Sequence, residues 1–306
     1  MSFAARLGAW LIVLLPLAAG LAHAAAPSPY TIVLGTAQDG GLPQPGCRRD
    51  CCAHGRHAAV SSLALVDPAS GRWWLFDATP DLGEQLARMR HEAPACSLAG
   101  VFLTHAHIGH YTGLMHFGRE VMGTHHVPVW AMPRMREFLA HNGPWDQLVR
   151  LDQIALQPLA ADSTVSLGDS LRVMPFRVPH RDEYSETVGF RIEGARGVVV
   201  YLPDIDKWER WDRRIEDAIA GTTAAYLDGT FFDASELPGR DMREIPHPFI
   251  VESLARFASG SATDRARVRF IHLNHTNRAA IPGSEEQRRI TRAGSRVAVI
   301  GERVTL

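Results

Sequence analysis

A hydrophobic strand that runs directly into three histidines sets the tightest limit on the fold of this chain. The segment is Val101-Phe-Leu-Thr-His-Ala-His-Ile-Gly-His110. Side chains two residues apart in extended backbone point the same way, so His105 and His107 can reach one cation. We expect a helix to begin near His110, whose ring could then face a second cation. Incidental surface histidines rarely gather at one strand-to-helix junction, so the pattern predicts a metal centre.

Composition excludes several classes of protein. Among 306 residues, Lys plus Arg number 32 and Asp plus Glu number 33, so the net charge is −1. A nucleic-acid-binding protein would usually carry a basic excess, so we expect no nucleic-acid partner. The hydrophobic content of 46% argues against a mostly disordered chain, and four cysteines are too few for a disulfide-dense scaffold. Fifteen histidines, most of them in short clusters, again favour metal binding.

The amino terminus has the layout of a secretory signal peptide. Arg6 is the only charge before an apolar run from Leu7 to Leu21, and Ala22-His23-Ala24 is a small-x-small cleavage site. The apolar run is short for a bilayer span, which needs about 20 residues. We therefore predict a signal peptide over residues 1–24 and a periplasmic or secreted chain with no stable membrane insertion after cleavage. An uncleaved anchor is the alternative.

Short strands mixed with helical stretches predict one α/β domain of two packed halves over residues 25–306. Helical periodicity is expected at Pro80–His91, Pro133–Asn142, Trp208–Ala220, His247–Ser259 and Ser284–Ala293. Strands are expected at Tyr30–Gly35, Ser61–Val66, Arg72–Asp77, Leu98–Leu103, Val127–Ala131, Leu171–Val178, Thr187–Glu193, Gly197–Leu202, Ala224–Leu227, Val268–Leu273 and Arg296–Ile300. The glycines between Gly35 and Gly41 do not open a helix, so we expect them to let the backbone pass close to the metal site.

The histidine segment resembles the metallo-β-lactamase superfamily, whose signature is His-x-His-x-Asp-His after a hydrophobic strand. His105, His107 and His110 match, whereas Gly109 stands where the family has an aspartate that ligates the second metal. The resemblance implies a four-layered αββα sandwich with metals at the edge where the two sheets meet. The departure at Gly109 predicts a weakly filled or exchangeable second site.

The same resemblance implies the remaining ligands. His180 fits the third ligand of the first metal, and His272 fits the last ligand of the second metal beside His110. Asp204 fits the bridging carboxylate that would also orient the catalytic water, with Asp206 as the weaker alternative.

Three cysteines, Cys47, Cys51 and Cys52, predict a second feature. They could form a disulfide, with Cys47 joined to Cys51 or Cys52, or they could hold a structural zinc with His275 as fourth ligand. The zinc interpretation is supported by resemblance to a phosphodiesterase branch that holds such a zinc with three cysteines and a His-x-x-His pair. That branch has the spacing Cys-x-Cys-x-x-Cys, whereas here the middle cysteine has moved to give Cys-x-x-x-Cys-Cys.

The coenzyme PQQ synthesis protein B branch of the superfamily is the closest resemblance. It is carried by Leu34-Gly-Thr-Ala-Gln-Asp-Gly-Gly-Leu-Pro-Gln44, by Asp228-Gly-Thr-Phe-Phe232 and by His272-Leu-Asn-His-Thr-Asn277. That branch often has a histidine where His247 stands. His247 could line a substrate pocket, or it could cap or pack the following helix.

These features lead to three functional hypotheses. The first is an exported hydrolase with one or two active-site zinc ions, cleaving an ester, amide or phosphodiester bond of a small-molecule substrate. The second is iron at the same ligands, oxidising a tyrosine-derived precursor of the quinone cofactor. The third is a metal- or quinone-binding protein without turnover. No feature of the sequence indicates an oligomeric state.

Overall fold

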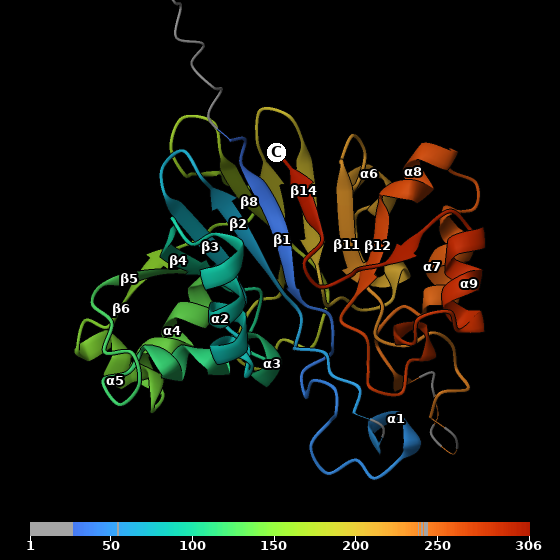
Figure 1. Ribbon diagram of the computed structural model, residues 1–306, viewed down its shortest axis with the longest axis horizontal. Helices are drawn as coiled ribbons and strands as arrows, with labels where there is room; N and C mark the ends of the chain where they lie inside the picture. The colour runs from blue at the N-terminus through green and yellow to red at the C-terminus, as the bar shows by residue number, and fades with distance from the viewer. Residues whose placement is uncertain (1–26, 54, 238, 240, 242–243) are drawn as a thin grey trace, which may run out of the picture.

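The computed structural model describes residues 27–53, 55–237, 239, 241 and 244–306. The predicted signal peptide, residues 1–24, lies outside this part of the chain. Two seven-stranded sheets lie face to face, with helices on both outer sides (Figure 1). Among the described residues, no helix has the length and apolar character needed to cross a membrane.

The first sheet has the strand order β14-β1-β2-β3-β4-β5-β6. Its strands are β14 (Arg303–Thr305), β1 (Tyr30–Gly35), β2 (Ser62–Asp67), β3 (Arg72–Phe76), β4 (Ser97–Phe102), β5 (Val127–Ala131) and β6 (Ile154–Pro158). The second sheet has the order β13-β12-β11-β10-β9-β8-β7. Its strands are β13 (Arg296–Val297), β12 (Val268–Ile271), β11 (Ala224–Asp228), β10 (Val198–Leu202), β9 (Val188–Glu193), β8 (Arg172–Arg177) and β7 (Val165–Ser166).

Helices follow many of these strands. They are α1 (Asp50–Ala53), α2 (Leu82–Glu92), α3 (Ile108–Tyr111), α4 (Pro133–His141), α5 (Trp145–Arg150), α6 (Ile215–Ala218), α7 (Ile250–Phe257), α8 (Ala262–Arg267) and α9 (Glu285–Arg292). Helices α2 to α5 lie on the outer side of the first sheet, and α6 to α9 lie on the outer side of the second (Figure 1).

Strand side chains alternate between two separate cores. In β2, Leu63 and Leu65 point to the core between the sheets, whereas Ala64 and Val66 point to the core under the helices. Period-2 alternation with apolar residues on both faces is what a sheet covered on both sides requires. The helix–sheet–sheet–helix order confirms the predicted αββα sandwich.

Aromatic rings fill the core between the sheets. Phe102 stacks on Phe76 at 5.1 Å and on Trp130 at 4.6 Å between ring centroids. Phe190 from the second sheet meets Phe102 edge-on at 5.7 Å. These contacts fix the second sheet against β3 and β4, and so fix the strand ends that carry the site.

Parallel pairing brings the chemically important residues to one edge. Strands β3 and β4 are parallel, and so are β10, β11 and β12. Ligands collect at the carboxyl ends of parallel strands, because the loops that follow them lie together. His105, Asp204 and His272 each follow the carboxyl end of one of these strands.

The helix expected over Trp208–Ala220 is interrupted. Only the 3₁₀ turn Trp208–Arg210 and the short helix α6 form there. The Trp208 indole donates to Ser253 Oγ at 2.9 Å, and the Trp211 indole donates to the carbonyl of Arg177 at 3.0 Å. Tertiary contacts of these two side chains therefore override the helical periodicity.

Candidate metal centre

One group of potential ligands combines three histidines with Asp204. His105, His107, His180 and Asp204 present ligand atoms within 4.8 Å of one another. Nε2 of His105 lies 3.4 Å from Asp204 Oδ2, and Nε2 of His180 lies 3.4 Å from Asp204 Oδ1. The structure thus brings together all four residues expected at the first metal.

A second group lies beside the first. It consists of Asp39, His110 and His272, again within 4.8 Å. Asp204 Oδ2 is 3.4 Å from His110 Nε2 and 3.5 Å from His272 Nε2. The Asp204 carboxylate therefore contacts imidazoles of both groups, as expected for a bridging ligand.

Several atoms that face the centre have no hydrogen-bond partner among the described residues, as expected where a metal ion would bind. The Nε2 atoms of His105, His110, His180 and His272 and the Oδ1 atom of Asp39 are buried and have no hydrogen-bond partner among the described residues. A buried polar atom without a partner costs about 1–3 kcal/mol. Their convergence, and their nitrogen and carboxylate chemistry, fit a zinc or iron ion.

The four imidazoles that face the centre with Nε2 are each held through Nδ1. The partner atoms are Thr104 Oγ1 for His105 (2.9 Å), Asp77 Oδ2 for His110 (2.8 Å), Asp206 Oδ1 for His180 (3.1 Å) and Thr230 Oγ1 for His272 (3.0 Å). Such partners fix the orientation of a metal-binding imidazole and raise its basicity.

His107 is oriented the opposite way. Its Nε2 lies 3.4 Å from Glu183 Oε2 at the surface. Its ring lies 4.4 Å from that of His105 and 4.9 Å from that of His180. Nδ1 is therefore the nitrogen left to face the metal.

Burial and charge set the protonation of the first group. Burial lowers the pKa of His107 to about 4, and burial together with the neighbouring His110 lowers the pKa of His105 well below its ordinary value. Burial alone would raise the pKa of Asp204, but the imidazoles around it hold that pKa well below its ordinary value. Neutral imidazoles and an ionised carboxylate are the forms that bind metals.

His247 lies at the same centre. Its Nδ1 is 2.8 Å from Asp228 Oδ2 and 3.1 Å from Asp204 Oδ1. Burial opposes protonation, but the carboxylates of Asp228 and Asp204 raise the pKa of His247 to about 10. The structure thus places this residue beside the expected ligands, in contact with the Asp204 carboxylate.

Comparisons with known proteins agree with this geometry. A family model described as "Beta-lactamase superfamily domain" matches residues 72–273. A coenzyme PQQ synthesis protein B from Ruegeria pomeroyi is 30% identical over 90% of this chain and 99% of the relative. The chain belongs to the metallo-β-lactamase superfamily, in the coenzyme PQQ synthesis protein B branch.

Solved structures of the superfamily share the fold. Zn²⁺-bound PqqB from Methylobacterium extorquens has a TM-score of 0.74 and 25% identity, over 90% of this chain and 100% of that one. A diphosphatase of the PhnP family has a TM-score of 0.66 and 20% identity, over 92% and 98%. The second likeness shows the fold alone.

Three carboxylates at this centre were not predicted from the sequence, because the superfamily signature used to assign the ligands does not include them. Asp77 directly follows β3, and Asp228 is the last residue of β11. Asp39 lies in the glycine-containing segment expected near the metal site. The position of an aspartate after a strand was a usable signal for Asp77 and Asp228, whereas nothing in the pattern of Asp39 distinguished it from a turn residue.

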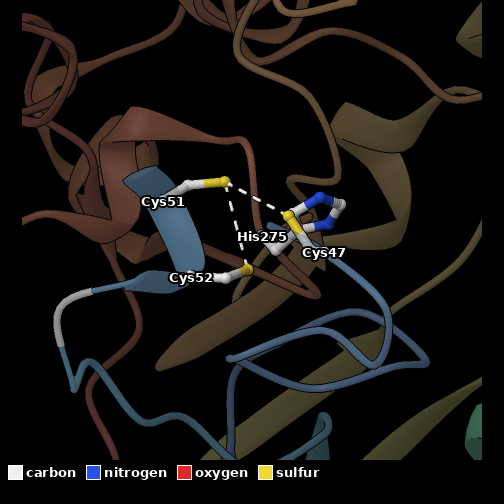
Figure 2. Close-up of side chains that lie close together, drawn as sticks. All are labelled: Cys47, Cys51, Cys52 and His275. Carbon is white, nitrogen blue, oxygen red and sulfur yellow. Dashed lines mark hydrogen bonds between the residues drawn. The ribbon is translucent and has the colours of Figure 1, made fainter. Parts of the chain in front are cut away.

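The three cysteines and His275 form a separate cluster (Figure 2). All four cysteines of the chain lie in its described part, and all are free. Cys51 Sγ lies 3.9 Å from Cys47 Sγ and 4.0 Å from Cys52 Sγ. A disulfide needs about 2.05 Å, whereas thiolates bound tetrahedrally at about 2.3 Å from zinc lie about 3.8 Å apart. This spacing favours the zinc interpretation over the disulfide.

The structure around the cluster also favours a bound cation. Cys51 and Cys52 both lie in the short helix α1, and His275 Nδ1 is buried without a hydrogen-bond partner among the described residues. Burial and the adjacent thiols raise the pKa of Cys51 to about 11. A bound cation would favour the thiolate form of Cys51.

Proposed function

We propose that this chain is an exported metallohydrolase that uses a metal-activated water to cleave an ester, amide or phosphodiester bond of a small molecule. The observation that carries the proposal is the position of Asp204. Its carboxylate contacts His105 and His180 on one side and His110 and His272 on the other. A carboxylate shared by two ligand groups would help to hold two metal ions, which would activate a water molecule for hydrolysis.

Zinc fits both groups, with His105, His107, His180 and Asp204 as ligands of the first ion. When bound, zinc lowers the pKa of its water to about 7 and polarises the scissile bond. Asp204 would orient that water, since its two oxygens already face both groups. The buried position of this carboxylate, 2% exposed, limits competing contacts with bulk solvent.

His247 is suited to give a proton to the leaving group. Asp228 and Asp204 hold its Nδ1, which fixes the ring and would leave Nε2 as the nitrogen available to a substrate. A general acid must reach the leaving atom within hydrogen-bond distance, and a ring held by two carboxylates moves little. This gives His247 the substrate-contacting role.

Export and a third zinc complete the proposal. The apolar amino-terminal run and its cleavage site support transfer out of the cytoplasm. The sulfur spacing and free thiols support a structural zinc at Cys47, Cys51, Cys52 and His275. Such a zinc would hold the segment that contains α1 beside the active site.

The test is metal-dependent turnover of chromogenic esters and of bis(p-nitrophenyl) phosphate. The full chain, His107→Ala and the control His125→Ala are compared after chelation and zinc reloading. His125 is a surface histidine, 82% exposed. We expect turnover to need zinc, to fall at least about a hundredfold in His107→Ala and to persist in His125→Ala. Equal turnover in all three would contradict the proposal.

Iron-dependent oxidation is the second candidate, favoured by the 30% identity to a coenzyme PQQ synthesis protein. Histidine and carboxylate ligands suit iron as well as zinc. Oxygen uptake by iron-loaded protein, lost in His107→Ala, would favour this candidate. Absence of both hydrolysis and oxygen uptake with loaded metal would favour a binding protein without turnover.

A further inference from the structure

We propose that Asp39 is a ligand of the second metal, in the role that the superfamily gives to the aspartate missing at position 109. The inference rests on the metal binding that the proposed function requires, but not on hydrolysis. It replaces the expectation of a weakly filled second site with that of a complete one, built from a different part of the chain.

The position of the Asp39 carboxylate is the first observation. Asp39 Oδ1 lies 3.4 Å from His110 Nε2 and 3.8 Å from His272 Nε2. Ligands bound to zinc at about 2.0–2.2 Å in tetrahedral geometry lie about 3.3–3.6 Å apart. Oδ1 is buried and has no hydrogen-bond partner among the described residues. The 3.4 Å separation falls within this range and the 3.8 Å separation lies slightly above it, so the three atoms, all without a hydrogen-bond partner among the described residues, can close around one ion.

The loop that carries Asp39 is fixed to the strand that carries His272. The backbone N–H of Gln38 donates to the carbonyl of Leu273 at 2.9 Å. The Asn274 amide donates to Gln38 Oε1 at 2.5 Å. The two residues that directly follow His272 thus hold the residue before Asp39, so the carboxylate is positioned by the fold.

Gly109 supplies the space that Asp39 occupies. A Cβ at position 109 would lie 2.1 Å from Asp39 Oδ1 and 2.7 Å from Asp39 Cα. Gly109 lies in helix α3 and has no left-handed φ, so the glycine is needed for room and not for backbone freedom. An aspartate at position 109 and the present path of the Asp39 loop are therefore mutually exclusive.

The experiment counts metal in the full chain carrying Asp39→Asn, with Asp39→Glu and Asp169→Asn beside it. Asp169 is an exposed aspartate between β7 and β8, and no group of potential metal ligands in the described part of the chain includes it. Each protein is dialysed at defined free zinc and analysed for bound zinc per chain. Cobalt loading, followed by visible absorption, then reports the second site independently of activity.

We expect Asp39→Asn to bind one zinc fewer than Asp169→Asn, or to bind its last zinc at least about tenfold more weakly. Asp39→Glu, which keeps a carboxylate, should recover part of that affinity. Equal zinc counts and affinities in Asp39→Asn and Asp169→Asn would overturn the proposal. Loss of every active-site zinc together would also overturn it, because Asp39 would then support the fold and not one ion.

Turnover plays no part in this readout. A chain that binds both active-site ions and hydrolyses nothing would contradict the proposed function while the ligand role of Asp39 stands.

Discussion

His110 donates from Nδ1 to Asp77 Oδ2 at 2.8 Å, and both side chains are fully buried. Asp77 Oδ1 also accepts hydrogen bonds from the backbone N–H and the hydroxyl of Thr104, the residue before His105. One buried carboxylate therefore orients a second-group imidazole and fixes the strand end that leads to the first group. Asp77 couples the two halves of the metal centre.

Replacing Asp77 tests this coupling. Asp77→Ala leaves the His110 imidazole and the Thr104 N–H without their partner, so we expect the affinity of the second metal to fall about 10–100-fold. The free energy of unfolding of the metal-free chain should fall by about 3–5 kcal/mol, because a buried charged partner is lost. Zinc titration and urea denaturation measure the two effects. Unchanged zinc affinity, with Asp169→Ala as reference, would refute the positioning role.

A methyl group at position 109 should displace the Asp39 loop. Gly109→Ala places a Cβ 2.7 Å from Asp39 Cα, so the backbone must shift and the second metal should bind more weakly although no ligand is removed. Gly83→Ala is the matched control, since nothing lies within 4 Å of its Cβ in helix α2. Alanine there should be neutral or stabilise by about 0.5–1 kcal/mol. Zinc binding that is equal in the two variants would contradict the close contact.

The cysteine cluster should contribute to stability through its metal. In Cys52→Ser we expect one zinc fewer per chain and a lower melting temperature than in the wild type. A chelator should lower the melting temperature of this variant by less than it lowers that of the wild type. Cys96→Ser should keep the wild-type zinc count, since Cys96 lies outside the cluster. Zinc must displace protons from thiols such as Cys51, so affinity at this site should fall as pH falls. If Cys52→Ser has one titratable thiol fewer but the same zinc content as the wild type, Cys52 is not a zinc ligand.

Glu236 predicts a pH dependence of stability. Burial is the main reason that the pKa of this carboxyl is raised to about 7, from an ordinary 4.5. The native state therefore binds more protons than the unfolded state between these values, so its stability falls as pH rises through this window. The loss is at most about 3.4 kcal/mol for such a shift.

The Glu236→Gln variant isolates that dependence, because glutamine can accept the hydrogen bond from Thr276 Oγ1 without ionising. Urea denaturation at pH 4.5 and pH 8 is compared at one free zinc concentration. The wild type should lose more stability than the variant over this range. Parallel pH profiles would show that the Glu236 carboxyl is not protonated in the native state.

Local patterns predicted most strands, and the resemblance of the histidine segment to the metallo-β-lactamase superfamily predicted the sandwich. Val127–Ala131 is a strand with the predicted bounds, and the histidines of the decapeptide lie at the strand-to-helix junction. Short edge elements were missed, such as β14 at Arg303–Thr305, because three residues show no period and depend on pairing with β1. The helix over Trp208–Ala220 failed because two tryptophans are held by distant partners.

Some residues of the metal centre could likewise be predicted from the sequence, and others could not. Ligands at strand ends, such as His180 and Asp204, could be inferred because family order and strand position agree. The place of Asp39 depends on a loop held by Leu273 and Asn274, residues more than two hundred positions away. No local pattern encodes that contact, although Gly109 marked the place where a carboxylate was missing.

The most direct test of the account is the zinc content of Asp204→Asn beside Asp206→Asn. Asp204 contacts both ligand groups, whereas Asp206 contacts the centre only through Nδ1 of His180 and otherwise pairs with Arg210. At saturating zinc we predict that Asp204→Asn loses both active-site ions and keeps the one at the cysteine cluster, while Asp206→Asn keeps all three. Asp204→Asn that still holds both active-site ions would contradict the shared centre on which the proposed hydrolysis depends.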